Sequence, residues 1–237
     1  MKRPSRLILP ILVATGVAIL LFLPRNAFAA GLDLTQLDQT CLETQLKNCK
    51  VLTSGRLNSG WGDAEGEPLF AWQTQSGFTD ADGVLGGFVL FHYTDGAWSL
   101  FDSGFDGYRF EPPRLAAEDT LLHVAGVTAG TGAYNADRLY VFGDTGAAAY
   151  REDWTRIDIE SWRDDITPLL PEGLEIWKGV DFDFDDWFYG ALNARTPLWR
   201  ADDGNCCPSG GWATIHFEIE DNSLVPVSVD YLPPSEG

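Results

Sequence analysis

The sequence predicts a mainly β protein built from antiparallel hairpins, arranged as a sandwich or a curved meander. From Val51 onward, short apolar or alternating runs are separated by glycine, aspartate and asparagine. Two of these separators, Thr94-Asp95-Gly96 and Asp144-Thr145-Gly146, are typical of tight turns between antiparallel strands. We expect strands at residues 69–75, 87–93, 98–102, 121–124, 138–142, 154–159, 173–185, 192–200, 212–219 and 224–231.

Two helices are expected to accompany these strands. In the N-terminal segment, residues 30–50, apolar residues recur at helical spacing and predict an amphipathic helix that ends near Asn48: Leu34, Leu37, Cys41, Leu42 and Leu46. Later, Ser161-Trp162-Arg163-Asp164 has the pattern of a capping box, with an aspartate at its third helical position, and predicts a short helix stopped by proline. This helix would connect a β portion at 51–170 to a second one at 171–237, or lie within a single domain at 30–237.

The first 29 residues have the features of a secretory signal peptide. A positively charged start, residues 1–6, precedes an apolar run at 7–23, and Ala27 and Ala29 form the small-x-small pattern of a cleavage site. An uncleaved anchor is the alternative, but the apolar run is shorter than the roughly 20 residues that cross a bilayer. We therefore expect a periplasmic or secreted protein.

The charge of the chain restricts its partners. Cleavage would remove Lys2, Arg3, Arg6 and Arg25 and no acidic residue, changing the formal net charge from −19 to −23. Such a field repels phosphate backbones and anionic lipid, so neither nucleic acid nor a membrane surface is an expected partner after cleavage. The charge is compatible with cation binding or a basic protein partner, and the sequence does not indicate an oligomeric state.

All four cysteines lie after the signal peptide, which predicts two disulfides in an oxidising compartment. A bond between Cys206 and Cys207 would close a small ring across one peptide bond, which is rare. A bond between Cys41 and Cys49 requires the expected helix to end between them, because eight residues of continuous helix span about 12 Å. Crossed pairing, which would attach the N-terminal segment to the loop at 203–211, is the favoured alternative.

One run of acidic residues is the candidate metal site. Asp181, Asp183 and Asp185 alternate with phenylalanines, so on a strand the three carboxylates share one face. Carboxylates placed in this way are suited to calcium, although a solvated outer strand face is the more common explanation of the pattern. Calcium is the one cofactor considered, and otherwise no cofactor is expected.

No complete catalytic motif is present. The sequence has no Gly-x-Ser-x-Gly elbow, no His-Glu-x-x-His helix and no phosphate-binding loop. His92 and His123 lie within apolar runs, where a hydrogen-bonded core or sheet-face histidine is more common than a catalytic one. We name no catalytic residue, and an enzyme is not the favoured interpretation.

The most distinctive segment runs from Leu198-Trp199-Arg200 to Asn205-Cys206-Cys207-Pro208-Ser209-Gly210-Gly211. Together with the segments at 130–132 and 173–179, it resembles a group of uncharacterised exported bacterial proteins, over about residues 120–230. The resemblance implies a disulfide-fixed loop between two strands and brings no activity with it. Such a loop would hold a candidate binding site of four polar residues: Asp202, Asp203, Asn205 and Ser209.

Taken together, these features favour an exported binding or interaction module whose ligand is an envelope glycan or another exported protein. Nine tryptophans offer flat faces on which sugars stack. One alternative is a glycan hydrolase that draws paired carboxylates from Asp181, Asp183, Asp185, Asp202 and Asp203. Another is a structural envelope protein stabilised by calcium.

Overall fold

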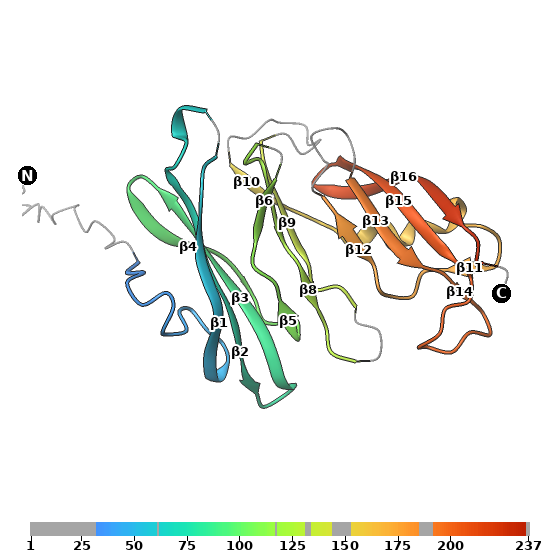
Figure 1. Ribbon diagram of the computed structural model, residues 1–237, viewed down its shortest axis with the longest axis horizontal. Helices are drawn as coiled ribbons and strands as arrows, with labels where there is room; N and C mark the ends of the chain where they lie inside the picture. Colours follow the sequence, from blue (N-terminus) through green and yellow to red (C-terminus); the bar gives the residue numbers. More distant parts are fainter. Residues whose placement is uncertain are drawn as a thin grey trace, which may run out of the picture. The chain divides into compact units, whose positions relative to one another are not determined.

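Three four-stranded antiparallel sheets make up most of the fold (Figure 1). The computed structural model describes residues 32–60, 62–116, 118–130, 134–143, 153–184 and 192–235, and these belong to one compact unit, residues 31–237. The expected signal peptide lies outside the described residues. The mainly β, antiparallel character predicted from the sequence is confirmed.

The first sheet is a meander in chain order: β1 (Lys47–Asn58), β2 (Pro68–Thr79), β3 (Gly83–Thr94) and β4 (Ala97–Gly104). The second has the order β10-β9-β7-β6, from β6 (Arg114–Ala116), β7 (Leu121–Val124), β9 (Arg138–Phe142) and β10 (Trp154–Ile157). The third contains β12 (Asp181–Asp183), β13 (Leu192–Pro197), β15 (Trp212–Glu220) and β16 (Ser223–Leu232). Two short pairs complete the strands of the described residues: β5 (Arg109–Phe110) with β8 (Gly126–Val127), and β11 (Leu174–Glu175) with β14 (Trp199–Arg200).

The second sheet is buried on both faces, which explains the continuous apolar runs in its strands. On β7, Leu121 and Leu122 are both fully buried although their side chains point to opposite faces. Leu122 packs with Phe88 and Leu90 of the first sheet. Leu121 belongs instead to the core formed with the third sheet. The second sheet therefore lies between the other two.

The predicted N-terminal helix is wrong. Leu34 and Leu37 lie in a single turn and cover the outer face of the first sheet, where they pack on Phe91. Glu43 and Asn48 have φ angles of 47° and 50°, which an α-helix does not tolerate. The leucine spacing thus reflects burial of an irregular segment, and β1 begins at Lys47, where the helix was expected to end.

The predicted connecting helix is also wrong. Its residues form two short 3₁₀ turns, η2 (Ser161–Asp164) and η3 (Thr167–Leu169), which with η1 (Gly62–Ala64) are the helical turns of the described residues. Asp158 Oδ1 accepts hydrogen bonds from the backbone N–H groups of Glu160 and Ser161 at 2.9 and 3.1 Å. The residue at the N-cap position of η2 is Glu160, not Ser161, and its side chain makes no capping bond. The described residues contain no α-helix and no helical segment able to cross a membrane.

The favoured crossed pairing of cysteines is wrong as well. Cys41 is bonded to Cys49, with their Cα atoms 6.2 Å apart, and Cys206 is paired with its neighbour Cys207. The first bond is feasible because the chain reverses between Cys41 and β1 instead of continuing as a helix. No disulfide therefore joins the N-terminal segment to the loop at 203–211.

We expect the paired substitution Cys41→Ser with Cys49→Ser to lower the free energy of unfolding by about 2–3 kcal/mol, because the bond restricts a short loop of the unfolded chain. Urea unfolding monitored by tryptophan fluorescence measures this loss. The matched control is Cys206→Ser with Cys207→Ser, which removes a bond between neighbours and should cost much less. Non-reducing peptide mapping that recovered a Cys41–Cys206 or Cys41–Cys207 peptide would contradict the assignment.

Candidate functional site

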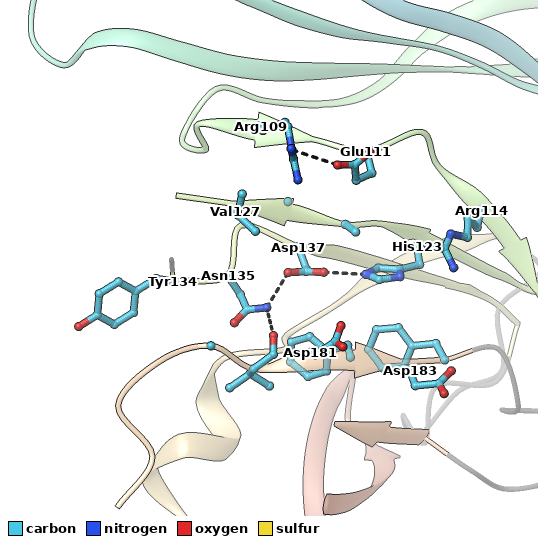
Figure 2. Close-up of a pocket in the computed structure, with 16 residues that line it drawn as sticks. Arg109, Glu111, Arg114, His123, Val127, Tyr134, Asn135, Asp137, Asp181 and Asp183 are labelled. Atoms are coloured by element: carbon cyan, nitrogen blue, oxygen red, sulfur yellow. Dashed lines mark hydrogen bonds and ion pairs between the residues drawn. The ribbon is translucent and has the colours of Figure 1, made fainter. Parts of the chain in front are cut away.

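A pocket of about 560 Å³ opens where the short strands β5 and β8 and the adjoining end of β7 face β12. Figure 2 shows Arg109 and Glu111 on one side of it and Asp181 and Asp183 on the other. The chemistry-bearing residues of the lining are Arg109, Glu111, Arg114, His123, Tyr134, Asn135, Asp137, Asp181 and Asp183. We call this the His123 pocket.

The centre of the pocket is a hydrogen-bonded chain of three side chains. His123 Nε2 lies 2.8 Å from Asp137 Oδ1, and Asn135 Nδ2 donates to Asp137 Oδ2 at 2.8 Å. Asn135 Nδ2 also donates to the backbone oxygen of Val180, which precedes β12. The chain thus connects the second sheet to the start of the third (Figure 2).

Strand geometry places these groups together. On β7, His123 points to the same face as Leu121, toward the third sheet, and its ring contacts the edge of Phe184 at a centroid distance of 4.9 Å. Asp137 directly precedes β9, which pairs with β7. The side chains of His123 and Asp137 are only 12% and 6% exposed, so their orientation is fixed by packing as well as by hydrogen bonds.

This arrangement defines what His123 offers to a ligand. In the neutral ring, Nε2–H donates to Asp137, and Nδ1 is then an acceptor. Asn135 Oδ1 is a second acceptor, since it is buried and has no hydrogen-bond partner among the described residues. The pocket therefore contains polar groups whose positions are fixed by hydrogen bonds and packing.

The wall of the pocket carries more negative than positive groups. Its carboxylates are those of Glu111, Asp137, Asp181 and Asp183, against the guanidinium groups of Arg109 and Arg114. Arg109 Nε lies 3.0 Å from Glu111 Oε1, in an exposed ion pair at the rim. The balance favours neutral or positively charged ligands over phosphates.

Two of the three candidate metal residues, Asp181 and Asp183, belong to this pocket. Asp181 and Asp183 are exposed on β12 with buried Phe182 between them, as the alternation predicted, and both line the His123 pocket. Asp185 lies outside the described residues. Within the described ranges, no group of three histidine, cysteine, aspartate or glutamate side chains is positioned to hold a metal ion.

The candidate binding residues of the Cys206–Cys207 loop serve mainly to shape it. Asp203 accepts hydrogen bonds from Ser209 Oγ and from the backbone N–H groups of Ser209 and Arg200, at 2.6, 2.8 and 2.7 Å. These bonds, that from the Ser209 hydroxyl first, hold the pKa of Asp203 below its ordinary value. Asp202 is exposed, and none of the loop residues lines the His123 pocket.

Asn205 has a different partner. Its Oδ1 accepts a hydrogen bond of 2.8 Å from Nζ of Lys178, a residue that is only 3% exposed. A buried ammonium group requires such a partner. The loop thus brings Asp203 and Ser209 together, as expected of one rim, but directs Asn205 to a separate structural role.

Sequence reasoning missed the three residues at the centre of the pocket. The sequence predicts a hydrogen-bonded core or sheet-face histidine at His123, and no motif in it points to Asn135 or Asp137. The sequence pattern that could have indicated them is a histidine on one apolar strand and two polar residues within the three positions before the following strand. Neighbouring antiparallel strands place such positions side by side. Comparison with protein families, curated proteins and solved structures found no match.

Proposed function

We propose that the protein is an exported binding module that holds a hydroxyl-rich ligand, an envelope glycan, in the His123 pocket. The observation that carries this proposal is the convergence of fixed polar groups from β7, β12 and the segment before β9 on one pocket of about 560 Å³. A pocket of this size with a few oriented polar groups is typical of small-ligand sites.

The polar groups suit sugar hydroxyls, each of which both donates and accepts hydrogen bonds. Asp181 and Asp183 supply acceptors from β12, and the rim Arg109 supplies donors. Tyr134, which is 56% exposed at one end of the pocket, offers a ring on which a sugar face stacks. Hydroxyl recognition of this kind needs no cofactor.

The rigidity of the binding groups and the expected export of the protein support the same proposal. The binding groups stand on strands or directly beside them, and the Asp137 carboxylate uses both oxygens to hold its neighbours in place. The N-terminal features of a signal peptide direct the protein to the periplasm or the exterior, where envelope glycans are found.

The proposal is tested by glycan-array screening of the purified protein, followed by calorimetry on the strongest ligand. Asp181→Asn, which removes a charge from the pocket wall, should weaken binding by about tenfold or more, as expected when a hydrogen bond to a charged group is lost. The matched control is Asp202→Asn, in the exposed Cys206–Cys207 loop, which should leave affinity unchanged. Absence of any glycan ligand, or loss of binding in Asp202→Asn alone, would refute the proposal.

A second candidate, a glycan hydrolase, is favoured by the presence of Asp181, Asp183 and the His123–Asp137 pair in one pocket. These groups are of the types that serve as general acid and base. Any glycan that binds is therefore incubated with the protein and assayed for new reducing ends. Turnover abolished by Asp183→Asn would select the hydrolase, whereas binding without turnover selects the module.

A further inference from the structure

A second pocket, separate from the His123 pocket, has walls of unusual composition. It has a volume of about 820 Å³ and is lined by residues at the ends of β2, β3 and β4 of the first sheet and of β9 and β10 of the second. None of the described residues lines both this pocket and the His123 pocket. Its aromatic residues are His92, Tyr93, Phe101, Phe142 and Trp154, and its acidic residues are Glu67, Asp95, Glu118, Asp119 and Asp153. We call it the Trp154 pocket.

The aromatic wall is held in place by ring packing. Trp154 contacts Phe70 edge-on at 5.1 Å between centroids and Phe142 at 5.7 Å. His92 stacks on Phe70 at 4.8 Å and meets the edge of Phe101 at 5.8 Å. Because these partners come from both sheets, the rings are positioned before any ligand arrives.

Parts of the aromatic wall stay accessible. Phe142 is 37% exposed, and Trp154 and Tyr93 are half-buried. Aromatic surface that folding leaves open around a pocket can still be buried by a ligand.

The charged residues that the structure describes around the pocket are acidic. Five carboxylate residues line it, and no lysine or arginine is among the described lining residues. The nearest cation along β10, Arg156, instead lies 4.0 Å from Asp102 through its Nη1 atom. Burial lowers the pKa of His92 from its ordinary value.

We propose that the Trp154 pocket binds a small organic cation that carries an alkylated ammonium group. The faces of aromatic rings attract such a cation when it lies within about 6 Å of the ring centroid. The surrounding carboxylates compensate its charge, and they repel anions. A neutral ligand such as a sugar would gain binding energy from contact with the rings but not from the charge of the carboxylates. The negative charge of the described lining therefore favours a cation over a sugar.

The first experiment compares two probes of the same shape by calorimetry: choline and its neutral carbon isostere, 3,3-dimethylbutan-1-ol. Choline should bind saturably, and the isostere about tenfold more weakly or worse, since a partly desolvated cation–π contact is worth up to about 2 kcal/mol. Equal binding of the two would show an apolar pocket without cation recognition and overturn the proposal. No saturable binding of choline at millimolar concentration would also overturn it.

Variants then assign the binding to this pocket. Trp154→Leu removes a ring and should weaken choline binding by about tenfold or more, whereas Trp154→Phe should retain most of it. Asp153 is exposed beside Trp154, so Asp153→Asn should not disturb folding. This variant should also weaken choline binding, because it removes a negative charge from the pocket. Asp181→Asn in the His123 pocket is the matched control. If it weakens choline binding while Asp153→Asn does not, the assignment to the Trp154 pocket is wrong.

Discussion

Replacing Trp162 with alanine is expected to lower the free energy of unfolding by about 3–5 kcal/mol, the usual loss for removing a fully buried tryptophan. Trp162 lies in η2, in the segment between β10 and β11, yet it is only 1% exposed. Its ring meets the edge of Phe217 on β15 at a centroid distance of 5.3 Å. Its Nε1–H donates to the backbone oxygen of Ile159 at 2.7 Å, so the substitution leaves both a cavity and an unpaired carbonyl.

Urea unfolding followed by circular dichroism measures the effect. Trp162→Phe keeps a ring in the core and should lose less stability than the alanine variant. The control is Leu169→Ala in the neighbouring turn η3, where the side chain is 38% exposed and the expected loss is below about 1 kcal/mol. If Trp162→Ala cost no more than Leu169→Ala, the packing of this segment between the second and third sheets would be disproved.

The segment around Trp162 also shows why a local sequence pattern can predict the wrong secondary structure. The pattern around Ser161 predicts a helix cap, whereas the segment between β10 and β11 forms two short 3₁₀ turns. This segment buries Trp162 and Ile166 in the core that includes residues of the second and third sheets. Local capping preferences are worth about 1 kcal/mol, and burial of the indole exceeds that.

Strand prediction succeeded where both faces of a strand are buried or alternate cleanly. The expected strands at 121–124 and 138–142 coincide with β7 and β9, whose residues alternate between two cores. It failed for β1 (Lys47–Asn58), an edge strand with an irregular exposure pattern and several register shifts. Half-exposed edge strands provide little hydrophobic contrast, and the leucines before β1 favoured a helix.

Two long expected strands are interrupted in the structure, and the one at 192–200 is divided into β13 and β14. The run at 173–185 contains β11 and β12, separated by a segment in which Gly179 has a φ of 70°. A residue in this conformation breaks a strand. The interruption positions Val180 to accept the hydrogen bond from Asn135, so the same departure from regular structure builds one wall of the His123 pocket.

The site itself was harder to predict than the fold, because its parts are distant in the sequence. Asp181 and Asp183 were identified from their alternation, a local pattern. The contact between Asn135 and Val180, which are 45 residues apart, depends on how the second and third sheets pack. Without an alignment or a pairing rule between sheets, no residue pattern indicates it.

Asp137 is the residue on which the His123 pocket depends, and Asp137→Ala is expected to cost about 2–5 kcal/mol of unfolding free energy. Removing its carboxylate leaves His123 Nε2 and Asn135 Nδ2 without this acceptor, and each unsatisfied buried group costs about 1–3 kcal/mol. Asp137→Asn preserves the shape but offers one acceptor oxygen where two are used, so its loss should be smaller. Urea unfolding measures both.

Nitrogen chemical shifts of the His123 ring separate a positioning role from a merely structural one. In the parent protein the proton should reside on Nε2, facing Asp137. In Asp137→Ala, which offers no acceptor at this position, the ring should lose this preference and ligand affinity should fall. The control, Asp181→Asn, should change stability by less than about 0.5 kcal/mol and leave the His123 tautomer unchanged, because Asp181 is exposed on β12. A ring that kept its tautomer in folded Asp137→Ala would mean that packing against Phe184, rather than the carboxylate, orients His123.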